Sequence, residues 1–288
     1  MSLIERKITV TFLLADGAFA NGGSSLEVSG LRCEAQIDNI NGVSLGALQL
    51  RIHGMRIEDM NSLSLLGKKY MEARRNQVIV SAGDDDAGMT QVFSGTIFQA
   101  FIDYGSMPDV GFVVSASSAY FESLQKTAAV SVDGSVDVAT IIQSISSGIG
   151  FDFKNNGVTA KLSNQYLDGS PIAQITCAAQ AARIACSITN QKVSIWPNGG
   201  VRDDQVVPIS KETGLVGYPR YSQYGIDVVT LFNPLLANGR KATVTSDAVG
   251  ASGDWYVQVV RHELASQVPG GPWYSTAQLT GEGFYVAH

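Results

Sequence analysis

The chain has 288 residues, of which 45% are hydrophobic and 16% are charged, with 30 glycines and 8 prolines. This composition excludes a disordered, collagen-like or coiled-coil protein and predicts a folded chain of two or three domains. The net charge of −6 offers no basic surface to a nucleic-acid backbone, and no apolar stretch reaches the roughly 20 residues of a membrane helix. The low charged fraction suits a surface that is buried against neighbouring subunits.

Residues 1–120 are predicted to form the first β domain. Apolar and polar residues alternate in runs that are typical of half-buried strands, and turn residues separate the runs. Ile57, Met60 and Leu63 recur every three residues and predict a short helix over Arg56–Leu66, which Gly67 ends. The predicted strands are Lys7–Leu14, Ser25–Asp38, Ser44–His53, Gln77–Ala82, Thr90–Ile102 and Gly111–Ser117.

Residues 121–205 are predicted to form a small α+β insert with the order helix, hairpin, helix, hairpin. We expect Ser135 to cap the first helix, and Ser170 and Pro171 to be the N-cap and first residue of the second. The apolar stripes of the two helices are Val138, Ile141, Ile142, Ile145 and Ile149 in the first, and Ile172, Ile175, Ala179 and Ala182 in the second. The predicted hairpins join Phe151–Phe153 to Val158–Leu162 and Ala185–Thr189 to Lys192–Trp196.

Residues 206–288 are predicted to form a second β domain. Its expected strands are Asp227–Leu231, Arg240–Ser246, Trp255–Glu263 and Gln278–Ala287. The fold class is therefore mainly β, with two β-barrel or β-sandwich domains flanking the α+β insert. A β region on each side of an insert suggests a duplication, although the sequence shows no residue-level repeat.

The residue types of enzyme sites are sparse, and we expect no catalytic, cofactor-binding or metal site. His262-Glu263 begins like a zinc-protease motif, but Ser266 stands where the second histidine ligand is required, and the surrounding pattern is that of a strand. Asp84-Asp85-Asp86 opens like a calcium loop, but Gly95 occupies the twelfth position, where the bidentate carboxylate belongs. We expect an exposed hairpin tip there, with adventitious cation binding as the alternative.

We expect the cysteines and the late aromatic residues to have mainly structural roles. Cys33, Cys177 and Cys186 are an odd set without metal-ligand spacing, which indicates small buried hydrophobes and assembly in a reducing cytoplasm. We expect the late aromatic residues to lie in a core or an interface, with a carbohydrate-binding platform as the alternative. These residues are Trp255, Tyr256, Trp273, Tyr274, Phe284 and Tyr285.

Short segments across nearly the whole chain resemble the baseplate hub proteins of contractile-tail bacteriophages. Those that resemble the first tube-like domain of the hubs are Gln77–Gly83, Gln91–Ile97, Ala100–Asp103 and Met107–Val110. Those that resemble the second are Gly214–Pro219, Leu231–Pro234 and Gly270–Trp273. The middle module is similar to the α+β insert that these hubs carry between their tube-like domains.

The resemblance implies a structural protein of the virion, located in the tail baseplate. It implies a homotrimer whose six tube-like domains match the sixfold tail tube to a threefold central spike. The implied partners are the central spike protein, tail-tube or tube-initiator proteins and other baseplate proteins, with DNA only as cargo passing through the lumen. Some relatives carry a fused cell-wall hydrolase, and we expect any lytic activity to reside in another protein.

Two other functions stay open on the sequence alone. A carbohydrate-binding adhesin would use the late aromatic residues. A tail-associated hydrolase would use carboxylates that are dispersed along the chain, and the sequence does not show whether any two of them converge.

Overall fold

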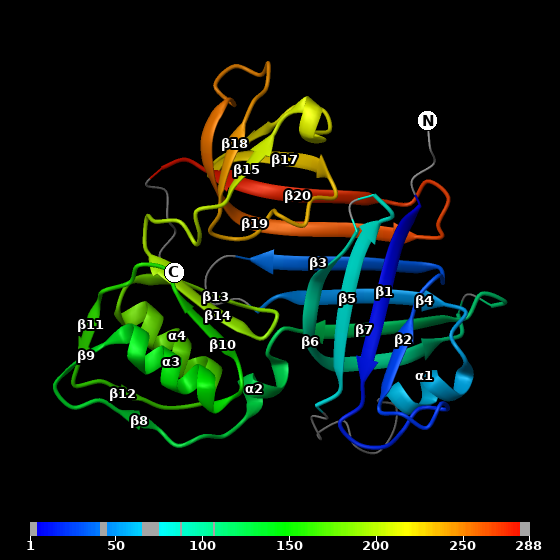
Figure 1. Ribbon diagram of the computed structural model, residues 1–288, viewed down its shortest axis with the longest axis horizontal. Coiled ribbons are helices and arrows are strands. Elements are labelled where there is room, and N and C mark those ends of the chain that lie inside the picture. Colours follow the sequence, from blue (N-terminus) through cyan, green and yellow to red (C-terminus); the bar gives the residue numbers. More distant parts are fainter. Residues whose placement is uncertain (1–4, 41–44, 65–74, 87, 106, 283–288) are drawn as a thin grey trace. The chain divides into compact units, whose positions relative to one another are not determined.

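The computed structural model describes residues 5–40, 45–64, 75–86, 88–105 and 107–282 (Figure 1). The chain divides into two compact units. Unit 1 comprises residues 1–38, 46–121 and 262–274, and unit 2 comprises residues 39–45, 122–261 and 275–288. The finer division into domains 1–120, 121–205 and 206–288 stays a prediction.

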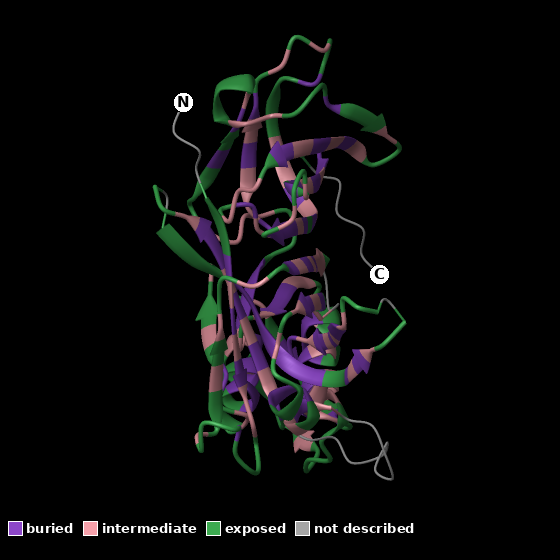
Figure 2. Cartoon of the chain, turned by 90° about the vertical axis from the view of Figure 1, so that its right-hand side faces the viewer, coloured by how far each residue is buried: buried purple, intermediate pink, exposed green. Residues whose placement is uncertain are grey.

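Unit 1 is built on a sheet in which seven strands follow the order β2-β1-β5-β6-β7-β4-β3. Each pair with a described register is antiparallel, and buried residues alternate with more exposed ones along the strands (Figure 2). The strands are β1 (Arg6–Leu13), β2 (Ser25–Val28), β3 (Cys33–Ile40), β4 (Ala47–His53), β5 (Gln77–Asp84), β6 (Gly88–Asp103) and β7 (Gly111–Ser117). The predicted strands are confirmed with one correction: Ser25–Asp38 forms two strands, because Gly30 has a φ of 69° and turns the chain.

The sheet of unit 1 curls over its own core. Strands β1 and β7 are three positions apart in the strand order, which would separate them by roughly 14 Å in a flat sheet. Yet the rings of Phe12 on β1 and Phe112 on β7 lie 6.3 Å apart in an edge-to-face arrangement, and both are fully buried. The strands therefore enclose one core, as expected for a barrel or a sandwich.

The helix α1 (Ile57–Leu63) of unit 1 is shorter than predicted. Met60 and Leu63 are buried as the three-residue spacing indicates. The helix ends at Leu63 because Ser64 adopts an extended conformation, while its backbone N–H and its hydroxyl both donate to the carbonyl of Met60. The expected stop at Gly67 lies outside the described residues.

Unit 2 contains the α+β insert, in which the helices α3 (Val138–Gly148) and α4 (Pro171–Ala181) pack together and contact a three-stranded sheet (Figure 1). This sheet has the order β10-β14-β13, with β10 (Asp152–Asn155), β13 (Ile184–Thr189) and β14 (Lys192–Pro197). The short helix α2 (Tyr120–Leu124) leads from unit 1 into this region. Two small ribbons pair β8 (Val130–Ser131) with β12 (Tyr166–Leu167) and β9 (Ser135–Asp137) with β11 (Lys161–Ser163).

The second half of the insert confirms the sequence predictions. The Ser170 side chain accepts a hydrogen bond from the backbone N–H of Ala173, with Pro171 opening the helix. Strands β13 and β14 form the predicted hairpin, in which Asn190 and Gln191 both have positive φ.

Two predictions for the first half of the insert are wrong. Ser135 does not cap α3, because it pairs with Ser163 in the β9–β11 ribbon and the N-cap residue is Asp137. The hairpin between Phe151–Phe153 and Val158–Leu162 does not form. Instead β10 pairs in parallel with β14, and β11 returns to β9.

The second β region of unit 2 has the strand order β16-β17-β20-β19, with β18 beside β19 and β15 beside β18. Its core holds eleven buried apolar residues, among them Val228, Val257 and Leu279. The strands are β15 (Val206–Ile209), β16 (Arg220–Ser222), β17 (Gly225–Leu231), β18 (Lys241–Val244), β19 (Gly253–Ser266) and β20 (Trp273–Thr280), with a 3₁₀ turn at Lys211–Thr213. The last strand thus begins at Trp273 and not at the predicted Gln278, and residues 283–287 of that prediction lie outside the described residues.

The two β regions share a strand order. Numbering the five strands β3 to β7 from one to five, their order in the sheet is 1-2-5-4-3. The strands β16 to β20 follow the same order. In both regions the fourth strand is the longest, with 16 residues in β6 and 14 residues in β19. The strand beside the third strand of each region differs in direction between the two regions. In the first region β1 runs antiparallel to β5, whereas in the second β15 runs parallel to β18.

Within unit 2, the insert joins the second β region through a close contact. A Cβ atom at Gly239 would lie 2.4 Å from the ring of Trp196, so only glycine fits there. The backbone N–H of Arg202 donates to the carbonyl of Gly239 at 2.7 Å, and Arg240 forms an ion pair with Asp203. No described helix has the length and apolar character needed to span a membrane.

The core of the insert can be tested at Ile145. Replacing Ile145 with Asp places an unpaired carboxylate among the buried residues of α3, and we expect the free energy of unfolding to fall by roughly 3 kcal/mol or more. Thermal and urea unfolding measure the loss. The exposed neighbour Ser144 supplies the matched control, since Ser144→Asp should change the stability little; equal stability of both variants would contradict the assigned packing of α3.

Candidate assembly surface

The three aspartates at 84–86 form the predicted hairpin tip between β5 and β6. Asp84 pairs with Gly88 across the turn, and its carboxylate accepts the backbone N–H of Asp86 at 2.9 Å. The carboxylate of Asp85 forms an ion pair with Lys7. The carboxylates of Asp84 and Asp85 therefore make local contacts, and the described residues contain no group of three or more potential ligands that could hold a metal.

His262 lies on strand β19 and is 3% exposed. Burial lowers the pKa of its imidazole to about 4, and the nearby carboxylate of Asp38 only partly opposes this shift. The Ser266 hydroxyl donates to the carbonyl of Leu31. A zinc-protease motif requires a helix, so the strand geometry excludes this arrangement at His262 and Glu263.

The late aromatic residues that the structure describes differ in their burial. Trp273 is buried, with the guanidinium of Arg6 5.8 Å from its ring. Trp255 is partly buried and donates its indole N–H to the carbonyl of Ala251. Tyr256 is half-buried and Tyr274 is exposed, whereas Phe284 and Tyr285 lie outside the described residues. This distribution favours core and interface roles for the rings.

The cysteine prediction needs one correction. Cys33, Cys177 and Cys186 are all unpaired thiols, as expected. Burial raises the pKa of Cys33 and of Cys186 to about 12, so both are inert core residues. Cys177 is exposed on α4, because it lies on the helix face opposite the buried stripe.

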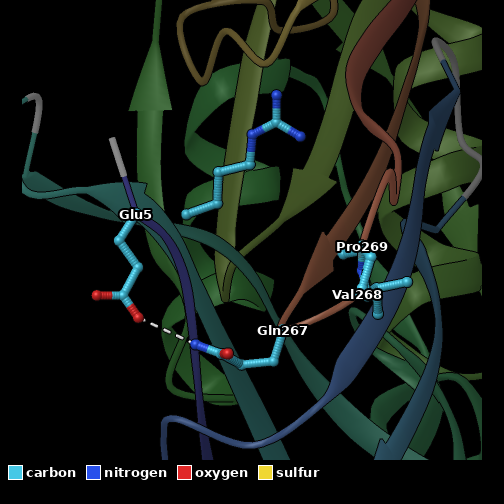
Figure 3. Close-up of a pocket in the computed structure, with 6 residues that line it drawn as sticks. Glu5, Gln267, Val268 and Pro269 are labelled. Carbon is cyan, nitrogen blue, oxygen red and sulfur yellow. Dashed lines mark hydrogen bonds between the residues drawn. The ribbon is translucent and has the colours of Figure 1, made fainter. Parts of the chain in front are cut away.

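A shallow pocket of unit 1 lies where the start of β1 meets the turn between β19 and β20 (Figure 3). The side-chain amide of Gln267 donates to the carboxylate of Glu5 at 3.0 Å, and Arg6 donates to the carbonyl of Gly271 at 3.3 Å. Two polar lining residues, Glu5 and Gln267, thus bind each other. Glu5 is its one lining carboxylate, so the pocket lacks the paired acid and base of a hydrolase.

Several large apolar side chains on and near β16 of unit 2 are exposed, and we call this group of side chains the β16 patch. The exposed fraction is 62% for Tyr221, 70% for Tyr218 and 93% for Val249. The hydroxyl of Tyr221 donates to the carbonyl of Val249 and fixes the loop beside the strand. The patch comprises Val216, Tyr218, Tyr221, Tyr224, Leu231 and Val249.

Backbone hydrogen bonds join residues 214–216, which precede β16, to β17. The N–H of Val216 donates to the carbonyl of Val229, and the N–H of Leu231 donates to the carbonyl of Gly214, both at 2.8 Å. Gly214 has a φ of 98°, and a Cβ atom there would press on the side chain of Leu231. The apolar side chains are therefore displayed on an ordered scaffold, as in a protein interface.

Strand edges are the second exposed feature. Among the described residues of unit 1, β2 pairs with β1 alone. Within the described part of unit 2, β16 pairs with β17 alone. Such edges carry unpaired backbone N–H and C=O groups that can bind another chain. The sequence analysis did not single out Tyr221 or Tyr224; their spacing at intervals of three from Tyr218 was the available signal.

Comparisons with known proteins give one family match and several solved structures with a similar fold. A family model described as baseplate hub gp41 matches residues 8–278. No curated protein sequence matches significantly. A tail protein from Neisseria meningitidis MC58 is 10% identical with a TM-score of 0.62, over 96% of this chain and 98% of that one.

Two further solved structures have a similar fold. The 43 kDa tail protein of prophage MuSo2 from Shewanella oneidensis is 9% identical with a TM-score of 0.59, over 94% of this chain and 96% of that one. The E. coli c3393 protein, a type VI secretion system component similar to the T4 tail proteins gp27 and gp5, is 11% identical. Its TM-score is 0.58, over 88% of this chain and 74% of that one.

The buried His262 predicts a pH dependence of stability. Its pKa in the folded chain is about 4, below the value of about 6.5 in an unfolded chain, so protonation favours unfolding. The free energy of unfolding should therefore fall by roughly 2–3 kcal/mol between pH 7 and pH 4.5 through this group. Urea titrations at the two pH values measure the change. His262→Gln should reduce it, and an equal pH dependence in both proteins would contradict the assignment.

Proposed function

The chain belongs to the baseplate hub gp41 family, and from this membership we propose that it is a homotrimeric adaptor in a contractile phage tail. Three subunits form a ring that matches the sixfold tail tube on one side and the threefold central spike on the other. Its partners are the spike protein, tube or tube-initiator proteins and other baseplate proteins. The role is structural, without a catalytic reaction.

The shared strand order of the two β regions is the observation that carries this proposal. A trimer can make equivalent contacts with all six subunits of one tube ring only if each of its subunits presents two similar domains. The order 1-2-5-4-3 in both regions, with the longest strand in the same position, supports a duplicated tube-like domain. Three copies of two such domains supply six similar positions around one axis.

The similarity to the E. coli secretion component supports the spike as a partner. That protein is described as similar to both gp27 and gp5 of T4, and its chain shares the fold of most of this one. We infer that this chain works beside a spike protein in a comparable assembly. Among the late aromatic residues, Trp273 is buried, and Trp255 and Tyr256 are partly buried. Together with the neutral, buried His262, this burial gives no support to an adhesin or a hydrolase.

The acidic character of the first β region fits a ring through which DNA passes without binding. Residues 1–120 contain 13 acidic and 9 basic residues, which is −4 of the total charge of −6. Such a surface repels a phosphate backbone. DNA is therefore cargo and not a ligand of this protein.

Multi-angle light scattering tests the proposed trimer. We expect a solution mass of three times 30.6 kDa, either for the purified chain or after the other baseplate proteins of its phage are added, since partners that bind the trimer favour assembly by mass action. A chain that stays monomeric with every tail partner present would rule out the adaptor function.

A further inference from the structure

A ring of identical subunits joined head to tail needs two different surfaces that fit each other. Within the described residues, the sheet of unit 1 ends in β2 and that of the second β region ends in β16 and β15. The edge of β15 is the weaker candidate in unit 2, because Pro208 in this strand has no backbone N–H to donate. The edges of β2 and β16 contain no proline.

The two candidate edges have similar lengths. Strand β2 has four residues and β16 has three, so each can supply about one short ladder of backbone hydrogen bonds. Glycines bound the segments on both sides: Gly23 and Gly30 flank β2, and Gly217 and Gly225 flank β16. A ladder of backbone hydrogen bonds between β2 and β16 would therefore be short, and few residues would set its register.

The charges of the two edges are complementary. Glu27 is exposed on β2 and Arg220 is exposed on β16. Neither side chain forms an ion pair among the described residues, although Asp227 lies across from Arg220 on β17. Glu27 is thus the charged group that β2 offers to a partner.

The side chains around the edges are also suited to burial. The β16 patch presents three exposed tyrosines, Tyr218, Tyr221 and Tyr224, and tyrosine is enriched in protein interfaces. On β2, Leu26 and Val28 are only half-buried against β1. Their remaining apolar surface lies on the strand that a neighbour would meet.

We propose that the β2 edge of one subunit pairs with the β16 edge of the next, with Glu27 facing Arg220 and the β16 patch covered by the neighbouring subunit. The pairing rests on the proposed trimer and identifies its subunit contact. Each interface joins a unit 1 edge to a unit 2 edge of a different chain. The contact therefore repeats three times around the ring and leaves neither edge exposed.

Cysteine cross-linking in the full-length chain tests the pairing. In a Cys177→Ser background, which removes the exposed native thiol, Glu27→Cys is combined in turn with Arg220→Cys, Tyr221→Cys or Ser222→Cys. A disulfide requires Cα atoms about 4.4–6.8 Å apart, so one of the three combinations should cross-link best. We expect covalent dimers and trimers on gels after mild oxidation, and no larger species.

The single-cysteine variants are the matched controls. If β2 paired with β2, or β16 with β16, a single cysteine would give covalent dimers; in the proposed contact it gives none. Cross-linked dimers from a single cysteine, or no cross-link from any of the three combinations, would overturn the proposal.

Charge reversal gives a second readout. Glu27→Arg or Arg220→Glu alone should raise the dissociation constant of the trimer about tenfold, and the double exchange should restore it. Reversals at the exposed residues Glu58 and Lys126 should leave it unchanged. A trimer that resists both single reversals contradicts the β2–β16 contact but keeps the adaptor function. If the chain is monomeric with all tail partners present, both the β2–β16 contact and the adaptor function are ruled out.

Discussion

The long strand β6 is the constraint on which unit 1 depends. Its first part pairs with β5 and its second part with β7, with a register shift on each side. At the crossing, Gly95 approaches β7 so closely that a Cβ atom would lie 2.5 Å from the carbonyl of Ser117. This close approach lets the sheet curl until Phe12 and Phe112 meet, because a side chain there would hold the strands apart.

In the proposed ring, the backbone groups that build the fold also make the functional surface. An enzyme concentrates its function in a few side chains, whereas a ring component distributes it over ladders and apolar patches. The buried, neutral His262 and the inert thiols of Cys33 and Cys186 fit this organisation, since each serves packing. The exposed features are the short edges β2 and β16 and the tyrosines beside them.

Local signals predicted much of the fold. Alternating residues identified the strands, and Ser170 with Pro171 identified the start of α4. The hairpin at Phe151–Phe153 failed because β10 pairs with β14, about 40 residues away, and no local pattern encodes a parallel partner. The proposed assembly surface was missed for a similar reason: whether Tyr221 lies on an edge depends on the order of strands, which the sequence of Arg220–Ser222 does not contain.

The shortness of β2 and β16 has a kinetic consequence for a ring built on them. A ladder of three or four residues binds one neighbour weakly, so a pair of subunits would dissociate readily. The third subunit makes two contacts at once, and the second of these forms at a high effective concentration. Intermediates would then be scarce and closed rings persistent. Weak edges would also protect newly made subunits from open-ended polymerisation before closure.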